Sequence, residues 1–236
     1  MSTKVESGRK AKKEGHDFED VISEIFTQRF GTEFLVEGSS KTKVDVRDVM
    51  SNARFSVKNP SGKNTQIGLY TQNSFIEALE IKDSDIISFI GMFFGGPAYS
   101  NYRRHRLTRS KIDSNLNEKF TQFLNDNTAK ILDLLATHGY NQNDDVNYMI
   151  WANKKNDPNS IILIDLKEFK EDLMQGKWTQ NETTFEFRVN DKKLFHLQMK
   201  GSGPKHTSGY HSLMFHVHSN FDNKYVKDLD IIKDIL

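Results

Sequence analysis

A carboxylate and a lysine that could act together in catalysis lie on two neighbouring stretches of alternating polar and apolar residues. Residues 43–49 and 54–58 alternate in this way, which predicts two half-buried strands joined by a short polar turn. Ser56 and Lys58 then share a face of their strand, and Asp45 faces them if the register allows. Metal-assisted phosphodiester hydrolysis requires such an acid and ammonium on rigid backbone, whereas the alternative is an exposed cross-strand ion pair without a catalytic role.

A helix that precedes this hairpin carries a second candidate acid. Asp17 is a suitable N-cap and Gly31 a suitable stop, so the sequence predicts a helix between them. Its apolar side chains recur at helical spacing, at Phe18, Val21, Ile22, Ile25 and Phe26. Glu19 lies beside this stripe, and we therefore expect its side chain to tilt toward the core rather than into water.

The rest of the pattern predicts a central mixed β-sheet flanked by helices. Residues 59–66 are rich in turn formers and are expected to form a loop. Helices are expected at residues 74–94, 115–138 and 166–175, and strands at residues 33–36, 148–152, 161–165, 184–189, 194–199 and 212–218. Helices around a hairpin, followed by a late set of strands, are typical of an α/β or α+β fold.

Length and composition indicate an ordinary globular protein. Its 236 residues are 36% hydrophobic and 28% charged, which is enough for a substantial core. We expect a flexible basic arm over residues 1–14 and a single domain over residues 15–236. No apolar run approaches the roughly 18–20 residues that span a bilayer, and a chain without Cys has no disulfide or thiolate metal site. A cytoplasmic location fits these features best.

The net charge of +1 conceals an uneven distribution of charges. Residues 49–76, 86–112 and 192–221 contain no Asp or Glu, although each window contains basic residues. Acidic residues gather instead in windows such as 113–145 and 222–234. This segregation favours a protein with one polyanion-binding face and an acidic opposite side.

The order of these features resembles the PD-(D/E)xK nucleases, and more narrowly the small MspI-like type II restriction endonucleases that cut tetranucleotide sites. The resemblance covers most of the chain. It rests on the Lys-x-Asp strand, on Val-Lys followed by a loop ending in Gln66, on Gly-Gly-Pro-Ala-Tyr with its basic continuation, and on the late pair Leu-Gln-Met-Lys-Gly and Leu-Met-Phe-His. It implies a restriction-endonuclease-like core over residues 15–236.

The resemblance also implies the roles of the candidate site residues. Asp45 would bind Mg²⁺, the Val57 carbonyl would supply a further oxygen, and Lys58 would be the catalytic lysine. Glu19 would help through a metal-bound water. Ser56 stands where the family usually has a second acid, and a hydroxyl is a poorer Mg²⁺ ligand than a carboxylate. Asp48, an odd number of residues from Asp45, is expected to be structural.

Double-stranded DNA is the partner that this resemblance implies. Amide and basic side chains suit base edges and phosphates, and the candidates are Ser61, Lys63, Asn64, Gln66, Tyr102, Arg103, Arg104, Arg106, Gln198, Lys200, Lys205, His206 and Tyr210. For each group the alternative is a solvated polar loop. A palindromic target would favour a homodimer, and a cognate DNA methyltransferase would be a genetic rather than a physical partner.

Three other interpretations stay open. His216 and His218 share a face of an expected strand and could bind zinc, although no third ligand follows at convincing spacing. Ser56 is also compatible with a DNA-binding module that keeps the fold without the chemistry. A structure-specific repair or junction nuclease could use the same core.

Overall fold

The chain forms two compact units, each with its own sheet. The first unit comprises residues 1–65, 136–171 and 221–236, and the second comprises residues 66–135 and 172–220. The structure is a computed structural model that describes residues 4–37, 44–60, 62–94, 109–137, 146–199, 212–221 and 223–236. One domain can contain two such units, so the expectation of a single domain over residues 15–236 stays a prediction.

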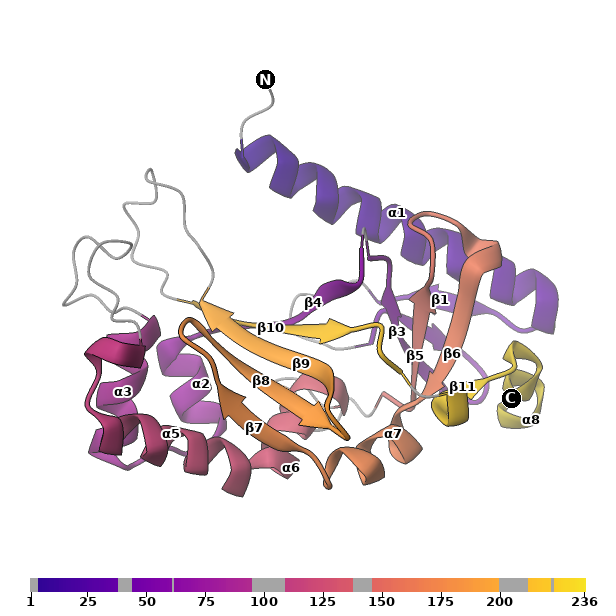
Figure 1. Cartoon of the computed structure of the whole chain (residues 1–236). Helices are drawn as coiled ribbons and strands as arrows, with labels where there is room; N and C mark the ends of the chain where they lie inside the picture. The colour runs from indigo at the N-terminus through magenta and orange to yellow at the C-terminus, as the bar shows by residue number, and fades with distance from the viewer. Residues whose placement is uncertain are drawn as a thin grey trace. The chain divides into compact units, whose positions relative to one another are not determined.

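The first unit is built on a six-stranded sheet in the order β1-β2-β3-β5-β6-β11 (Figure 1). Its strands are β1 (Phe34–Val36), β2 (Val46–Asp48), β3 (Arg54–Lys58), β5 (Tyr148–Ala152), β6 (Ile161–Asp165) and β11 (Val226–Lys227). β3 and β5 run parallel, whereas the other neighbours are antiparallel. The predicted hairpin and the predicted mixed sheet are thus confirmed.

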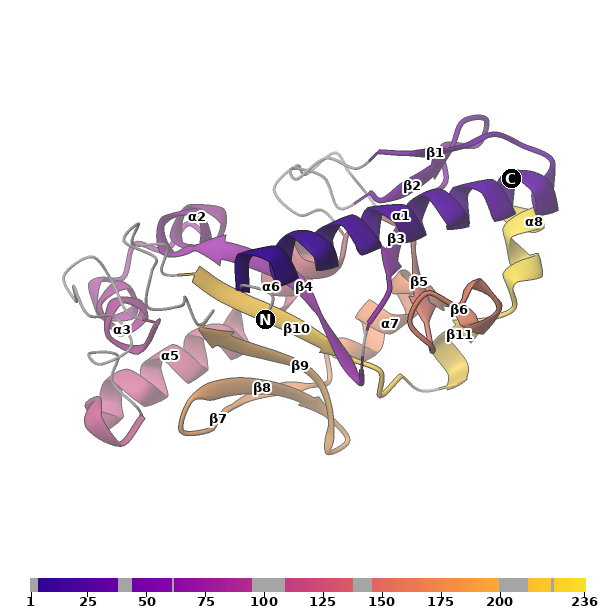
Figure 2. The same ribbon diagram turned by 90° about the horizontal axis from the view of Figure 1, so that it is seen from above.

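Helix α1 (Lys4–Phe30) packs against this sheet through most of the predicted apolar stripe (Figure 2), whereas Val21 of that stripe is exposed. Phe18, Ile22 and Phe26 are buried in one cluster with residues of β2, β3 and β5. The Phe26 ring makes edge-to-face contacts with the rings of Phe34 and Phe55, which are favourable beyond the apolar area that they bury. The second half of α1 is therefore fixed to the strands that carry the candidate site.

The first half of α1 differs from the sequence expectation. Residues 4–14 are helical and continuous with the predicted helix, whereas a flexible arm was expected there. Lys, Glu and Ala have high intrinsic helix propensity, and Lys10 pairs with Glu14 one turn later at 3.8 Å. These local preferences extend the helix beyond the part that packs on the sheet.

Aromatic packing also covers the first unit away from α1. Phe169 of α7 (Leu166–Leu173) contacts the rings of Phe221 and Tyr225, and Phe221 contacts Trp151 of β5. A last helix, α8 (Ile232–Ile235), buries Ile232 in the α1 cluster. The sheet of this unit is flanked by helices, as the sequence predicts.

The second unit contains a five-stranded sheet in the order β4-β10-β9-β8-β7. Its strands are β4 (Asn64–Thr71), β7 (Lys177–Gln180), β8 (Thr184–Val189), β9 (Lys192–Met199) and β10 (Ser212–His218). Side chains such as Phe185, Phe195 and Phe215 alternate into the core. The polar residues between them, such as His196 and His216, lie on the other face because successive side chains of a strand point to opposite sides.

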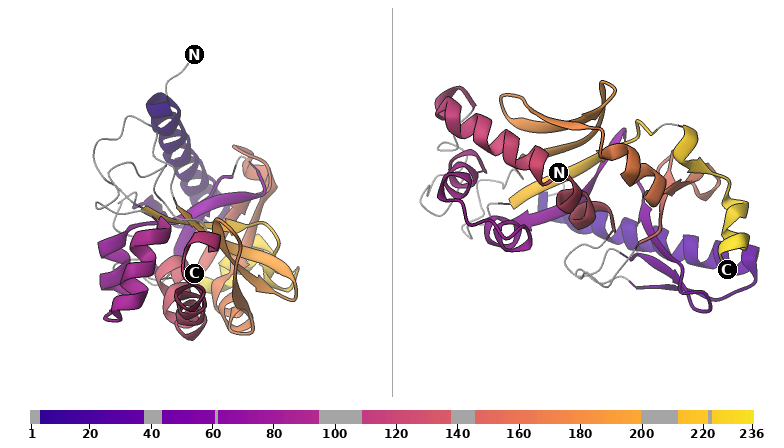
Figure 3. Two further views of the ribbon diagram at one scale, coloured as in Figure 1. Left: turned by 60° about the vertical axis from the view of Figure 1, so that its left-hand side comes forward. Right: turned by 90° about the horizontal axis from the view of Figure 1, so that it is seen from below.

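Helices cover the apolar face of this second sheet (Figure 3). They are α2 (Gln72–Ala78), α3 (Ser84–Phe94), α5 (Ser114–Asp126) and α6 (Thr128–Leu132). The rings of Phe89 in α3 and Phe120 in α5 stack at 4.4 Å, and both contact Phe185 of β8. Asn125 joins α5 to β7, because its Oδ1 accepts the Trp178 N–H at 2.8 Å.

Two long helices predicted from periodicity are broken in the structure. The expected helix 74–94 is split between α2 and α3, since Glu80 adopts φ +53° and Asp83 Oδ1 accepts the Asp85 N–H, which caps a new helix. The expected helix 115–138 ends as α5 at Asp126, continues as α6, and closes in a π-helical segment over Asp133–Thr137. Apolar spacing cannot reveal such breaks, because both sides of each break remain buried.

The expected loop over residues 59–66 ends earlier than predicted. Strand β4 begins at Asn64, so Asn64 and Gln66 lie on a strand. Gly68 interrupts the strand pattern in the sequence, because glycine is rare inside strands. In the structure, a Cβ at this position would lie 2.7 Å from Cε2 of Tyr70 and 2.9 Å from Cδ2 of Leu135. Close packing therefore requires glycine at this position.

Strand β7 was not predicted from the sequence. No described helix has the length and apolarity of a membrane span.

Candidate active site

Backbone pairing fixes Asp45 opposite Ser56. The register Val46–Phe55 of the β2–β3 hairpin continues by one residue, because the Asp45 N–H donates to the Phe55 carbonyl at 2.9 Å. On the other side, the Asp45 carbonyl accepts the Glu37 N–H at 3.0 Å. Asp45 is thus held by main-chain bonds to both neighbours, and its carboxylate is directed toward β3.

One oxygen of the Asp45 carboxylate accepts three hydrogen bonds from consecutive residues of β3. Oδ2 lies 3.0 Å from Ser56 Oγ, 2.7 Å from the Val57 nitrogen and 3.0 Å from Lys58 Nζ. The Asp45 and Lys58 side chains are 21% and 16% exposed, so this ion pair is only partly hydrated. Charge-assisted bonds in such surroundings are stronger than in water. Asp45 therefore faces Ser56 and Lys58, as the sequence predicts for a suitable register.

The bonds leave Asp45 with one oxygen available for a ligand. All hydrogen bonds that the described residues donate to this carboxylate go to Oδ2, and none goes to Oδ1. The Lys58 ammonium also donates to the Val57 carbonyl at 3.0 Å. Lys58 therefore bridges Asp45 Oδ2 and the Val57 carbonyl, and the latter is one of the expected oxygen ligands of a metal ion.

Glu19 is a second carboxylate whose protonation depends on this site. Burial raises the pKa of Glu19 above its ordinary value, and the negative charge of Asp45 raises it further. His16 opposes both effects, since its Nδ1 lies 3.0 Å from Oε2 of Glu19. A carboxyl with a raised pKa beside a second carboxylate is a typical feature of sites that hold a cation or transfer a proton.

The oxygens of this site suit a hard cation such as Mg²⁺. Asp45 Oδ1, the Val57 carbonyl and the Glu19 carboxylate are the oxygen donors that Mg²⁺ prefers, and Mg²⁺ usually takes one or two carboxylates and keeps several waters. In the described part of the chain no three His, Asp or Glu side chains are grouped closely enough to hold a metal. The oxygen atoms present are thus of the type that would hold Mg²⁺ together with waters and substrate.

Ser56 orients the acid in this structure. Its side chain is buried at 5% exposure and donates its hydroxyl hydrogen to Asp45. Asp48 is structural, because it is fully buried and accepts hydrogen bonds from Thr32 and Ser51. Burial raises the pKa of Asp48, but these hydrogen bonds outweigh it and the net pKa lies below the ordinary value.

Sequence reasoning missed a pair of asparagines next to Lys58. Asn59 Nδ2 donates to Asn156 Oδ1 at 2.6 Å, and the Asn156 N–H donates to Asn59 Oδ1 at 2.8 Å. Asn156 adopts φ +58° in the turn between β5 and β6, a conformation that asparagine tolerates better than most residues. The end of β3 is thereby tied to this turn. The signal in the sequence was only an Asn-Asp pair in a polar segment.

Few of the expected DNA-contacting residues can be placed. Lys63 and Asn64 are exposed in the first unit, whereas Gln66 and Gln198 belong to the second. Gln198 Nε2 lies 3.3 Å from His216 Nε2. The others, Ser61, Tyr102, Arg103, Arg104, Arg106, Lys200, Lys205, His206 and Tyr210, lie outside the described residues.

A third histidine joins the two that suggested a zinc site. His196 Nδ1 lies 2.7 Å from His218 Nε2, and the His196 ring stacks on that of His216 at 4.6 Å. Burial and the neighbouring cationic groups lower the pKa of His196 and of His218 to about 4, so both are neutral at pH 7. Within the residues that the structure describes, these side chains do not form a group that could hold a metal.

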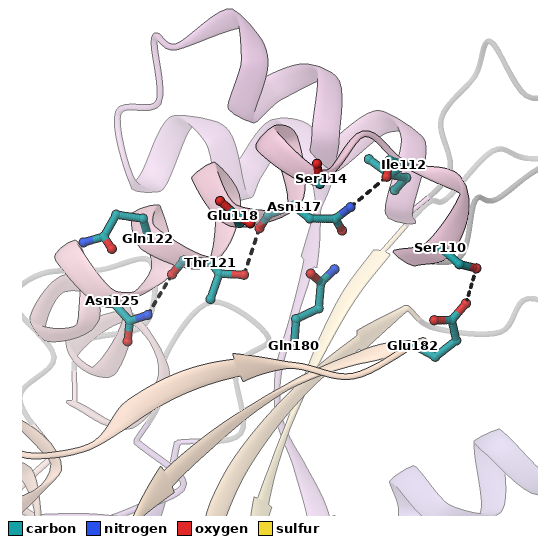
Figure 4. Close-up of a pocket in the computed structure, with 10 residues that line it drawn as sticks. All are labelled: Ser110, Ile112, Ser114, Asn117, Glu118, Thr121, Gln122, Asn125, Gln180 and Glu182. Carbon is teal, nitrogen blue, oxygen red and sulfur yellow. Dashed lines mark hydrogen bonds between the residues drawn. The ribbon is translucent and has the colours of Figure 1, made fainter.

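A polar pocket of about 790 Å³ lies elsewhere in the second unit (Figure 4). Residues of α5 such as Asn117 and Thr121 line one side, and Gln180 and Glu182 line the other. The Glu182 carboxylate accepts a hydrogen bond from the Ser110 hydroxyl at 2.8 Å. None of the described residues that were predicted to act in catalysis or DNA binding lines this pocket.

Comparisons with known proteins give a distant structural likeness. No protein-family model and no curated protein matches the sequence. Among solved structures, the crystal structure of restriction endonuclease MspI in complex with its cognate DNA is similar to 84% of this chain and 77% of its own, with 10% sequence identity and a TM-score of 0.46. A likeness at this level establishes neither common descent nor a shared activity.

Proposed function

We propose that this protein is a type II restriction endonuclease that hydrolyses phosphodiester bonds of double-stranded DNA at a specific sequence with Mg²⁺. The observation that carries the proposal is the convergence of Ser56, Val57 and Lys58 on one oxygen of Asp45, with the other oxygen open and Glu19 nearby at a raised pKa. This arrangement supplies a cation site, an ammonium and a titratable carboxyl within one rigid element pair.

In the proposed reaction each side chain has a separate role. Asp45 would hold the cation through Oδ1, and it keeps its own orientation through the bonds to β3. Mg²⁺, when bound, supplies positive charge that stabilises the phosphoryl oxygens in the transition state. Lys58 exchanges its bond to the Val57 carbonyl for one to the attacking water or a phosphoryl oxygen. Glu19, whose pKa is raised, accepts the proton of that water at a carboxylate oxygen.

One observation favours a second function. Ser56 donates to Asp45 rather than adding a carboxylate, so the site has less negative charge for a metal than a site with two acids on the hairpin. A DNA-binding module that has the fold but does not cut would have such a site. A structure-specific repair or junction nuclease is the remaining alternative.

Incubating the protein with plasmid DNA and Mg²⁺ separates these functions. Discrete fragments support a sequence-specific endonuclease, binding without cutting supports the module, and nicking confined to branched or damaged substrates supports the structure-specific nuclease. Fragment ends then give the recognition sequence. If that sequence is palindromic, we propose that the protein acts as a homodimer in the cytoplasm, and that a DNA methyltransferase protects the same sequence in the host.

A further inference from the structure

The helix that carries Glu19 continues well beyond the sheet on which it packs. α1 runs without a break from Lys4 to Phe30, and its N-terminal part projects past the strands of its own unit (Figures 1 and 3). Lys10, Lys12 and Lys13 are exposed there. Among residues 10 and 12–14, whose side chains are described, the link to the rest of the unit is the bond between Glu14 and Lys155 rather than a buried apolar side chain.

Helical periodicity places Lys12 on the same face as Glu19. Seven residues are close to two turns, so the two positions lie on one line along the helix and about 10 Å apart along its axis. That distance corresponds to about three base-pair steps of one DNA strand. The side chain of Lys12 is exposed, and among the described residues it makes no ion pair.

Gly15 lies between these two positions and leaves the face open. It is three residues from Lys12 and four from Glu19, the spacing of neighbours on one helix face. A Cβ at Gly15 would meet nothing within 4 Å, so no packing within the described structure requires glycine there. A glycine inside a helix lowers helix stability, and a bare helix backbone permits the close approach of another molecule.

The acid nearest in sequence points to another side of the helix. Glu14 is directed toward the β5–β6 turn, where its Oε2 lies 2.5 Å from Lys155 Nζ and its Oε1 lies 3.8 Å from Lys10 Nζ. The bond from Lys155 holds the pKa of Glu14 below its ordinary value. Lys10, two residues from Lys12, is about 200° away around the helix. Lys12 is therefore on a different face from Lys10 and Glu14, and it supplies a positive charge to the face that leads to Glu19.

We propose that the face of α1 formed by Lys12 and Gly15 binds the sugar–phosphate backbone of a DNA duplex beside the cleavage site. Lys12 pairs with a phosphate about three steps from the one at Asp45, and the bare backbone at Gly15 lets the strand pass close to the helix. The complementary charge and the continuity with Glu19 identify the occupant as the flank of the substrate itself. This proposal rests on the nuclease function.

The test measures binding rather than cleavage. Fluorescence anisotropy with a fluorescent DNA duplex of about 30 base pairs in EDTA, at salt concentrations from about 50 to about 200 mM, gives the salt dependence of affinity. Lys12→Gln should flatten the slope by about 0.9, which is about a threefold smaller loss of affinity over this range. Lys10→Gln is the matched control on the opposite side of the same helix and should leave the slope unchanged.

Gly15 provides an independent arm of the test. Gly15→Gln should raise the thermal unfolding midpoint, because it removes a helix glycine, and should weaken duplex binding severalfold, because its side chain fills the open space. Gly15→Ala should raise the midpoint with a smaller effect on binding. Equal slopes for Lys12→Gln and Lys10→Gln, or unchanged binding by Gly15→Gln, would overturn the proposal.

The outcomes distinguish this surface from the nuclease activity. If the wild-type protein cuts no DNA and yet Lys12→Gln and Gly15→Gln lose duplex binding, the docking surface stands and the nuclease proposal fails. If the wild-type protein cuts DNA and both variants bind normally, only the docking surface fails. Equal or tighter binding of an RNA duplex with the same variant effects would overturn the assignment to DNA.

Discussion

Lys58 and Asp45 form an ion pair in which one ammonium and one carboxylate oxygen lie 3.0 Å apart, while the same ammonium lies 3.0 Å from the Val57 carbonyl. Of these two oxygens, only the Val57 carbonyl is an expected cation ligand, because Asp45 would bind a cation through Oδ1 and Lys58 bonds to Oδ2. A cation held by the Val57 carbonyl would take the place of the ammonium there, and Lys58 would then be available to contact the substrate.

Removing either partner of this pair should abolish cleavage. Asp45→Ala and Lys58→Ala are each expected to lower the cleavage rate at least about a hundredfold, since they remove cation binding or water positioning. Each leaves a partly buried charge without its partner, at a cost of about 1–3 kcal/mol in unfolding free energy. Cleavage assays and thermal unfolding measure both effects, and near-native cutting by either variant contradicts the assignment.

Mg²⁺ affinity should distinguish the role of Asp45, as a cation ligand, from that of Lys58. Lys58→Ala is expected to bind Mg²⁺ as tightly as the wild type or more tightly, because the competing ammonium is gone, whereas Asp45→Ala should lose binding. Isothermal titration with Mg²⁺ provides the comparison. Weaker Mg²⁺ binding by Lys58→Ala would show that the lysine supports the cation rather than competing with it.

The protonation of Glu19 predicts a dependence of stability on pH. Its pKa is raised in the folded protein, so the favourable contribution is complete below the unfolded-state pKa and is lost as pH rises through the folded-state pKa. Glu19→Gln should therefore be more stable than the wild type at neutral pH and equally stable in acid. Chemical denaturation at several pH values tests this, and equal stability at every pH would contradict the raised pKa.

Ser56 should affect cleavage by orienting the Asp45 carboxylate rather than by binding the cation. Ser56→Ala removes one of three hydrogen bonds to Oδ2, so we expect it to retain most cleavage activity at a cost of about 1 kcal/mol in stability. Ser56→Asp places a second carboxylate beside Asp45 and should increase Mg²⁺ affinity. A loss of cleavage by Ser56→Ala as large as that of Asp45→Ala would show that the hydroxyl acts directly.

Asn156 should position Lys58 through Asn59. Asn156→Gly keeps a residue that tolerates φ +58° but removes the side-chain bond to Asn59, so it should lower the maximal cleavage rate with little change in DNA affinity. Asn156→Ala adds backbone strain of about 1 kcal/mol or more in unfolding free energy. The two variants are compared by cleavage kinetics and denaturation, and unchanged kinetics in Asn156→Gly would remove the positioning role.

Gln66 tests the assignment of base recognition. A good base contact contributes about 1–3 kcal/mol of discrimination, so Gln66→Ala should lose affinity for the cognate duplex and keep its affinity for scrambled DNA. Lys63→Ala, three residues earlier on an exposed position, should weaken both duplexes alike if it contacts a phosphate. If Gln66→Ala lost affinity equally for the cognate and the scrambled duplex, Gln66 would contact the phosphate backbone rather than a base.

The sequence by itself determined the hairpin that carries Asp45 and Lys58 and most of the sheet. Alternation over residues 54–58 placed Ser56 and Lys58 on one side of β3, and a strand has only two sides, so the pattern left a single arrangement. The helix with Glu19 followed from its apolar stripe in the same way. Local chemistry also accounts for part of the Asp48 environment, because Ser51 lies three residues away, whereas Thr32 is brought there from 16 residues away by the fold.

Only the tertiary structure decided which atoms of these residues contact one another. Periodicity does not say that three donors converge on Oδ2 of Asp45, or that Asn59 meets Asn156 across 97 positions of the chain. Strand β4 and the break between α2 and α3 were also decided there, because packing of Tyr70 against Gly68 and the backbone of Glu80 override local propensity. Contacts between distant residues depend on the whole fold, and the pattern of a single segment does not contain them.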